Sequence, residues 1–148
     1  MNVEEVLKTD KKIRPESRTI IHLLLVYNEI NERVSLALKP YGVSIQQFNV
    51  LRILRGQKGI PANLSTLNER MITKNSNTTR LVDKLVLKGY VEKIICPSNR
   101  RKIEITITSN GEKVLKEMDG VVASAEEELL DNFNESELLE LNHLLNKF

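Results

Sequence analysis

Tryptophan is absent from this chain of 148 residues, and aromatic residues of all kinds make up only 4% of it. Proteins that bind single-stranded nucleic acid stack bases on aromatic side chains, so this composition argues against that class of partner. The chain has a single cysteine, Cys96, and therefore no internal disulfide bond. Its two histidines, His22 and His143, lie far apart in the sequence, so we expect no metal site.

Long apolar runs are also missing. The longest, IIHLLLVY at residues 20–27, is interrupted by His22 and is too short to span a bilayer. The first twelve residues, MNVEEVLKTDKK, have no apolar core of the kind that a signal peptide requires. These absences predict a cytoplasmic protein without a membrane partner.

Catalytic motifs are missing as well. The sequence has no Gly-rich phosphate loop and no pairing of a nucleophile with a base. We therefore expect no enzymatic activity, no catalytic residues and no cofactor. Cys96 stands near basic residues that favour a thiolate, which leaves redox activity open, although a strand cysteine without a role is the simpler interpretation.

The remaining composition is that of a globular protein, with 41% hydrophobic and 28% charged residues. This length fits one domain, or one domain with an oligomerisation element. Apolar residues recur at helical spacing over residues 18–38, 44–55 and 64–71, and again in a helix that Thr73 is placed to cap and Gly89 ends. Ser44 with Gln47 predicts a capping box, and Asn63 or Ser65 is expected to cap the short third helix.

A β-hairpin follows these four helices. In ICPSNRRKIEITIT, residues 95–108, the isoleucines Ile103, Ile105 and Ile107 alternate with polar residues, which is the period of a half-buried strand. VEKIIC, residues 91–96, is its partner, and the turn between them presents two adjacent arginines. Two more helices are expected beyond it, opened by capping boxes at Ser109 with Glu112 and at Asn134 with Glu137. The predicted fold is mainly α with a small β-hairpin wing.

Charge is unevenly distributed along the chain. Residues 70–102 contain nine basic and two acidic side chains, whereas residues 103–148 contain eleven acidic and three basic ones. A basic middle segment indicates a polyanionic partner. The acidic end is explained equally well by an ordinary solvated surface.

The helix that follows Thr73 has the polarity of a DNA-reading helix. Its first turns are polar and its later turns carry an apolar stripe, so the start can enter a major groove while the end packs on the domain. An arginine on a rigid hairpin beside it can enter the neighbouring minor groove. The predicted DNA-binding residues are Ser65, Lys74, Asn75, Ser76, Asn77, Thr78, Thr79, Arg80, Lys84, Asn99, Arg100, Arg101 and Lys102.

The segment LSTLNERMITKNSNTTRLVDKLVLKGYVEKIICPSNRRKIEITITSNG, residues 64–111, resembles the winged helix-turn-helix core of the MarR family of bacterial transcriptional regulators. YGVSIQQFNVLRIL, residues 41–54, resembles the segment that leads into that core. The resemblance implies that Lys74 to Arg80 fall on the recognition helix and that Arg101 is the wing arginine. Family members often have Asp two residues before that arginine, where this chain has Asn99.

The same resemblance implies an obligate homodimer that reads a pseudo-palindromic operator. It also implies a small-molecule effector, often aromatic or anionic, in a cleft between dimer helices and reading head, but no motif marks its ligand-binding residues. Residues 1–40 and 110–148 are then the helical dimerisation region, and residues 41–109 the winged helix-turn-helix. Apolar stripes in the last two helices fit a dimer interface independently: Met118, Val121, Ala125, Leu129, Phe133, Leu138, Leu141, Leu145 and Phe148. The alternative is that they pack on the first long helix of the same chain, and we expect both kinds of contact.

The sequence therefore predicts a sequence-specific regulator of transcription that binds double-stranded DNA as a homodimer and acts as a repressor. The alternative is a winged-helix module for protein–protein interaction without DNA-binding activity. The basic, polar start of the recognition helix argues against that alternative, because such modules usually present an apolar or acidic face there.

Overall fold

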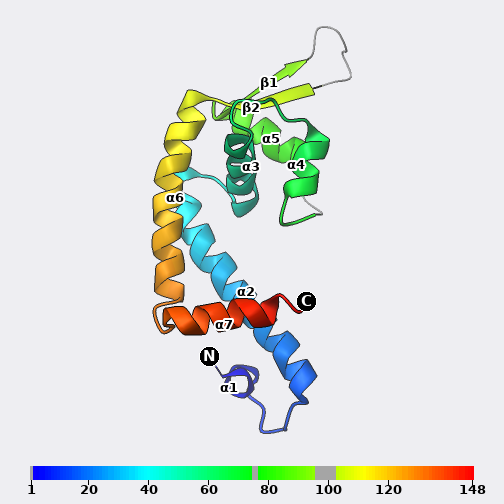
Figure 1. Ribbon diagram of the computed structural model, residues 1–148, viewed down its shortest axis with the longest axis vertical. Helices are drawn as coiled ribbons and strands as arrows, with labels where there is room; N and C mark the ends of the chain where they lie inside the picture. Colours follow the sequence, from blue (N-terminus) through cyan, green and yellow to red (C-terminus); the bar gives the residue numbers. More distant parts are fainter. Residues whose placement is uncertain (1, 75–76, 96–102) are drawn as a thin grey trace.

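The computed structural model describes residues 2–74, 77–95 and 103–148. These residues form seven α-helices, one 3₁₀ turn and one antiparallel hairpin, as Figure 1 shows. The elements are α1 (Val3–Leu7), α2 (Pro15–Leu38), η1 (Lys39–Tyr41), α3 (Ile45–Gly56), α4 (Leu64–Arg70), α5 (Thr78–Leu87), β1 (Val91–Ile95), β2 (Ile103–Ile107), α6 (Ser109–Leu129) and α7 (Glu135–Leu145). The predicted mainly α fold with a small wing is confirmed.

A reading head of α3, α4, α5 and the hairpin occupies one end of the molecule, opposite α1 and α7 (Figure 1). Its core is built around α3, whose Val50, Leu51 and Leu54 are buried with Val82 and Leu85 of α5. The ends of α2 and α6 nearest the head add further buried residues to the same core: Val34, Leu38, Leu115, Met118 and Val122. One continuous core therefore joins the head to both long helices.

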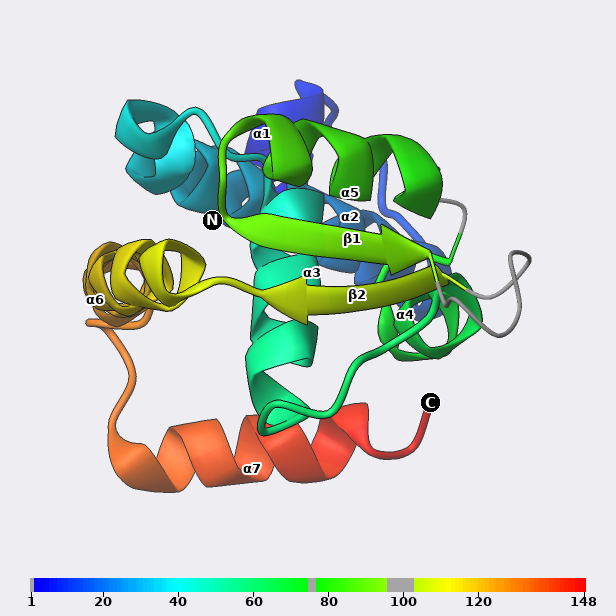
Figure 2. The ribbon, with the colours of Figure 1, turned by 90° about the horizontal axis from the view of Figure 1, so that it is seen from above.

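The hairpin packs on this core through one face of β2. β1 and β2 pair antiparallel, with Val91 opposite Ile107 and Ile95 opposite Ile103. Ile105 is fully buried, while Ile103 and Ile107 are half-buried against the core, as their alternation predicted. Ala62 extends the sheet beyond β2 by exchanging two backbone hydrogen bonds with Ile105. Figure 2 shows the two strands lying across α3.

Two of the predicted capping boxes are confirmed and one is wrong. Ser44 and Gln47 exchange hydrogen bonds at the start of α3, and Asn134 and Glu137 do so at the start of α7. At α6, however, Thr108 rather than Ser109 is the N-cap, and its hydroxyl accepts a bond from the Gly111 amide at 3.0 Å. The same hydroxyl donates to the Gly89 carbonyl at 2.7 Å, so the cap of α6 is also tied to the turn after α5.

Gly111 lies where the start of α6 closely approaches the backbone before β1. A Cβ atom at this position would lie 2.1 Å from the backbone oxygen of Tyr90 and 2.9 Å from Cγ1 of Ile107. The Tyr90 oxygen already accepts the Thr108 amide at 3.0 Å. Glycine lets α6 start in direct backbone contact with the residue that precedes β1.

The first helix, α1, was not predicted from the sequence. Asn2 caps it, and Val3 is fully buried although it lies outside the main core. Arg18 of α2 donates two hydrogen bonds to the Glu4 carboxylate, at 2.8 and 3.0 Å. These bonds hold the pKa of the Glu4 carboxyl below its ordinary value, so the pair remains charged at neutral pH.

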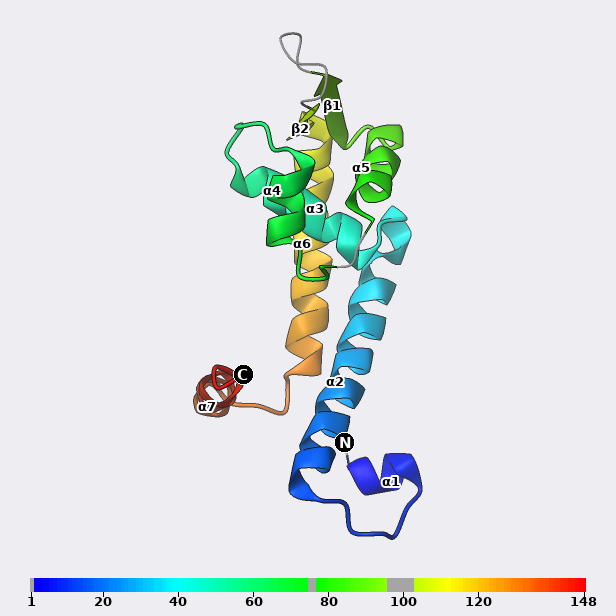
Figure 3. The ribbon, with the colours of Figure 1, turned by 90° about the vertical axis from the view of Figure 1, so that its right-hand side faces the viewer.

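The last helix, α7, buries none of its residues. Figure 1 shows it crossing α2 in projection, but Figure 3 shows that it stands apart from α2. Exposed apolar side chains gather on α7 and the end of the chain and on the outer part of α2: Leu139, Leu141, Leu144, Leu145, Phe148, Ile20, Leu24, Tyr27 and Ile30. Phe148 alone is 85% exposed. By contrast, Met118, predicted as part of the interface stripe, is fully buried in its own chain.

Candidate nucleic-acid interface

The candidate recognition helix, α5, has one buried and one exposed face. Thr78, Val82 and Leu85 are buried, at the i, i+4, i+7 spacing of a helix side that packs on a core. The opposite face is exposed and presents Asn77, Thr79, Arg80 and Lys84. A helix of this kind can be held by the domain while its polar side faces a partner.

The structure corrects where this helix begins. It starts at Thr78, with Asn77 as the N-cap whose side-chain oxygen accepts the Arg80 amide at 3.2 Å. Thr73, the predicted cap, lies instead in the turn between α4 and α5. Lys74 is in the same turn, and its ammonium donates to the Glu69 carbonyl at 2.6 Å. Asn75 and Ser76 lie outside the described residues.

Thr78 has a role different from the one expected of it. Its side chain is only 4% exposed, and its hydroxyl donates to the side-chain oxygen of Asn68 on α4. A buried side chain on the inner face of α5 cannot reach a base edge in a groove. The Thr78 side chain is therefore not a candidate for a base contact, whereas its neighbour Thr79 is exposed.

Helix α4 contributes a second polar surface beside α5. Asn63 caps it, as one of the two predicted alternatives, by accepting the Thr66 amide at 2.9 Å. Ser65 is exposed on its first turn and donates to Glu69 at 3.2 Å. The Ser65 hydroxyl can accept a further bond from a partner while it keeps this contact.

The electrostatics of α5 favour an anionic partner. Its one acidic residue, Asp83, forms an ion pair with Lys93 of β1, whose ammonium lies 2.9 Å from the carboxylate. Among the described residues, no carboxylate forms an ion pair with Arg80 or Lys84. The two exposed cations of α5 are therefore available to phosphate groups.

The remaining predicted DNA-binding residues form the tip of the wing, and their assignment rests on the sequence alone. Asn99, Arg100, Arg101 and Lys102, together with Cys96, lie outside the described residues, so their predicted roles stay predictions. Strands β1 and β2 lead into this segment at Ile95 and Ile103, which face each other in the last pair of the hairpin.

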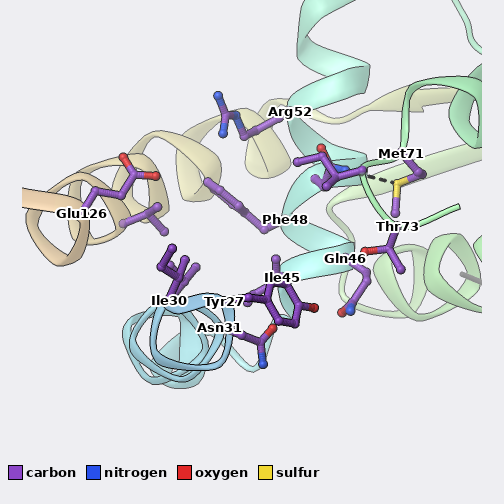
Figure 4. A pocket seen from close by; sticks show the side chains of 14 residues that line it. Tyr27, Ile30, Asn31, Ile45, Gln46, Phe48, Arg52, Met71, Thr73 and Glu126 are labelled. Atoms are coloured by element: carbon purple, nitrogen blue, oxygen red, sulfur yellow. Dashed lines mark hydrogen bonds between the residues drawn. The ribbon is translucent and has the colours of Figure 1, made fainter. Parts of the chain in front are cut away.

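A cavity of about 220 Å³ lies behind the recognition surface, where α2, α3, α6 and the α4–α5 turn meet (Figure 4). Its lining is largely apolar and includes Ile30, Phe48 and Met71. Arg52 of α3 and Glu126 of α6 are the two charged residues of the lining (Figure 4), and the Arg52 guanidinium carbon lies 5.6 Å from the centre of the Phe48 ring. The Asn49 amide donates to the Met71 sulfur at 3.6 Å, which connects α3 to the turn before α5.

The described residues contain neither a metal-binding cluster nor a membrane-spanning helix. No group of three or more His, Cys, Asp or Glu side chains in the described ranges is arranged to hold a metal ion. No described helix has the length and apolar character needed to cross a membrane.

Comparisons with known proteins assign this architecture to a family. A sequence model described as the MarR family matches residues 43–103. The uncharacterized HTH-type transcriptional regulator YpoP of Bacillus subtilis is 31% identical over 122 residues, which cover 82% of each chain. The chain belongs to the MarR family.

Other MarR proteins are similar to this chain over most of their length. The multiple antibiotic resistance protein MarR of Escherichia coli is 29% identical over 74% of this chain and 76% of its own. A putative MarR-like regulator from Bacillus cereus has a crystal structure that matches with a TM-score of 0.80 at 26% identity, over 89% of this chain and 94% of that one. A mutant of the E. coli protein, crystallised with operator DNA, shares the fold with a TM-score of 0.77 at 24% identity, over 93% and 98% of the chains.

Proposed function

We propose that the protein is a homodimeric repressor of transcription that binds a pseudo-palindromic operator in double-stranded DNA and is released by a small-molecule effector. The observation that carries the DNA-binding part is the exposed face of α5, on which Asn77, Thr79, Arg80 and Lys84 lie together without an acidic partner among the described residues. In this proposal α5 enters the major groove, and the wing arginine Arg101 enters the adjacent minor groove. The operator complex of the E. coli relative supports it by family membership.

The homodimer is supported by apolar side chains that the described part of the chain leaves exposed on α7 and on the outer part of α2. Helix α7 buries no residue, yet it and the end of the chain carry Leu141, Leu145 and Phe148 exposed to solvent. A helix this short, 11 residues, is marginal in water without tertiary contacts. A second copy that covers α7 and the outer face of α2 supplies those contacts, and residues 1–40 and 110–148 are then the dimerisation region, with residues 41–109 as the DNA-binding region.

Effector release is supported by the position of the cavity. It is lined both by α2 and α6, which belong to the proposed dimerisation region, and by Met71, Ile72 and Thr73 of the turn that leads into α5. A ligand there is in contact with both regions at once. The volume suits about one aromatic ring, and the flanking Arg52 and Glu126 favour a ligand that carries a polar or charged substituent.

The decisive experiment is enrichment of duplexes from a random-sequence library by the purified protein, followed by footprinting on the enriched sequence. We expect two half-sites about one helical turn, roughly 10 base pairs, apart, and affinity that falls steeply with salt. Transcription from a promoter that carries the enriched sequence should fall when the protein is added. Failure to enrich any duplex would favour the protein–protein module instead.

The effector is tested on the same complex. Small aromatic carboxylates and the matching aromatic amines are titrated into the protein bound to its enriched duplex, and release is followed by fluorescence anisotropy of labelled DNA. A carboxylate that releases the parent but not an Arg52→Ala variant supports the cavity as the effector site. Release that is unaffected by this substitution places the ligand elsewhere.

A further inference from the structure

Thr78 is the polar member of an otherwise apolar face. It is the first residue of α5 and shares the buried side of the helix with Val82 and Leu85. Val82 and Leu85 set which side of α5 faces the core, but they lie further along the helix and make non-directional contacts, so they constrain the rotation of its first turn less closely. A hydrogen bond depends on both distance and angle, so the Thr78 hydroxyl can fix that rotation.

The partner of this hydroxyl is on the other helix of the helix-turn-helix. Thr78 donates to the side-chain oxygen of Asn68, which lies on the last turns of α4 and is exposed. A hydroxyl this deeply buried is costly unless it is bonded, which favours retention of the contact. The bond therefore joins α4 directly to the first residue of α5.

Two further contacts hold the intervening turn. The Lys74 ammonium donates to the Glu69 carbonyl at 2.6 Å, and the Asn49 amide donates to the Met71 sulfur at 3.6 Å. Both contacts act on the turn, while the bond from Thr78 to Asn68 acts on α5 itself. Thr79 and Arg80 follow Thr78 immediately and point to the exposed side, so their direction depends on the rotation of this first turn.

We propose that Thr78 is a positioning residue for DNA recognition, which acts through Asn68 to aim the first turn of α5, and with it Thr79 and Arg80, at the operator. This inference rests on the proposed function, because it assumes that α5 reads DNA. It gives Thr78 a part in specificity although its own side chain touches no base.

The test is Thr78→Val, which removes the hydroxyl and keeps the branched shape. Because Asn68 is exposed, its freed oxygen can bond to water, so the variant should fold. Thr79→Val is the matched control, because it removes the same hydroxyl from the neighbouring residue, which lies on the exposed face of α5. Binding is measured to the duplex that the parent enriches and to a scrambled duplex of equal length. Amide hydrogen exchange is followed at Arg80 and Leu81, whose N–H groups are bonded to Asn77.

For Thr78→Val we expect affinity for the enriched duplex to fall about three- to tenfold, the usual effect of losing one neutral hydrogen bond. Affinity for the scrambled duplex should stay unchanged, because phosphate contacts tolerate small rotations. Amide exchange at Arg80 and Leu81 should accelerate, and Thr78→Ser should restore both properties. Thr79→Val should weaken binding without accelerating exchange.

A double-mutant cycle tests whether Thr78 acts through Asn68. If it does, Asn68→Ala should reproduce the loss, and the double variant should bind as well as either single variant does. Strictly additive losses would show that the two residues act separately and would overturn the proposal. Unchanged exchange, or unchanged affinity for the enriched duplex in Thr78→Val, would overturn it as well. If the parent protein enriches no duplex, the proposed function itself is refuted. If the parent binds its duplex normally and the variants do not behave as expected, only the positioning role of Thr78 is refuted.

Discussion

Gly111→Ala should be strongly destabilising although it adds a single methyl group. The new Cβ would lie 2.1 Å from the Tyr90 oxygen and 3.0 Å from the Tyr90 carbonyl carbon, so it would collide with backbone rather than with a side chain that can rotate away. A relaxed contact between carbon and a carbonyl oxygen is about 3.3 Å or longer, so α6 and the start of β1 would have to separate by roughly 1 Å.

The expected cost follows from this displacement. Overpacking of a well-packed site costs about 1–3 kcal/mol, and a clash with backbone on one side belongs at the upper end. Alanine recovers up to about 1 kcal/mol in a helix interior, but Gly111 lies in the first turn, where that gain is smaller. A net loss of about 2–3 kcal/mol lowers the melting temperature of a chain of this size by roughly 4–12 °C.

Gly120→Ala provides the control on the same helix. Gly120 lies in the middle of α6, and a Cβ atom there would meet nothing within 4 Å. The identical substitution should therefore raise the melting temperature by about 2–4 °C through helix propensity. Both variants are compared with the parent by calorimetry at one protein concentration, because the melting of a dimer depends on concentration. A Gly111→Ala variant that melts at or above the parent temperature would refute the steric argument.

Four further substitutions test other parts of the molecule. Leu141→Lys puts a charge on the unpartnered face of α7, and light scattering should then give a mass near 16.9 kDa instead of twice that value. Lys84→Ala should weaken binding to all duplexes alike and reduce the slope of log affinity against log salt by about one. Asn77→Ala removes the N-cap of α5 and should cost about 1 kcal/mol of stability in chemical denaturation. Arg101→Ala should cost on the order of 1–3 kcal/mol of operator affinity and relax any preference for A·T pairs beneath the wing. A variant that binds the operator, and each operator with a single base change there, as well as the parent does would contradict its role.

Features encoded by short, local patterns could be predicted from the sequence. Ser44 with Gln47 forms a capping box in either a peptide or a protein, and alternation in β2 identifies Ile105 as a core residue wherever the strand packs. The exposed set of Asn77, Thr79 and Arg80 also follows from helical spacing once the apolar stripe is known.

Features decided by contacts between distant residues could not be predicted. Thr73 and Asn77 are both suitable N-cap residues, and the choice of Asn77 goes with burial of Thr78 against α4. Ser109 has a capping box partner in sequence, but Thr108 is preferred because its hydroxyl also reaches the Gly89 carbonyl, 19 residues earlier. Helix α1 has only five residues, too few to show an apolar period, and its bond to Arg18 spans 14 positions, so the Asn2 cap is its only local signal among the described residues.

The uninterrupted length of α6 has a mechanical consequence. Its 21 residues run from the foot of the hairpin to the loop before α7, and at 1.5 Å per residue they form a rod about 31 Å long. If partner subunits are clamped at the lower end, each reading head moves as the tip of a lever. A tilt of about 5° at the clamp then moves the tip by about 3 Å, which is close to the roughly 3.4 Å that separates successive base pairs. If both subunits tilt by this amount, each recognition helix is displaced by about one base pair relative to its half-site.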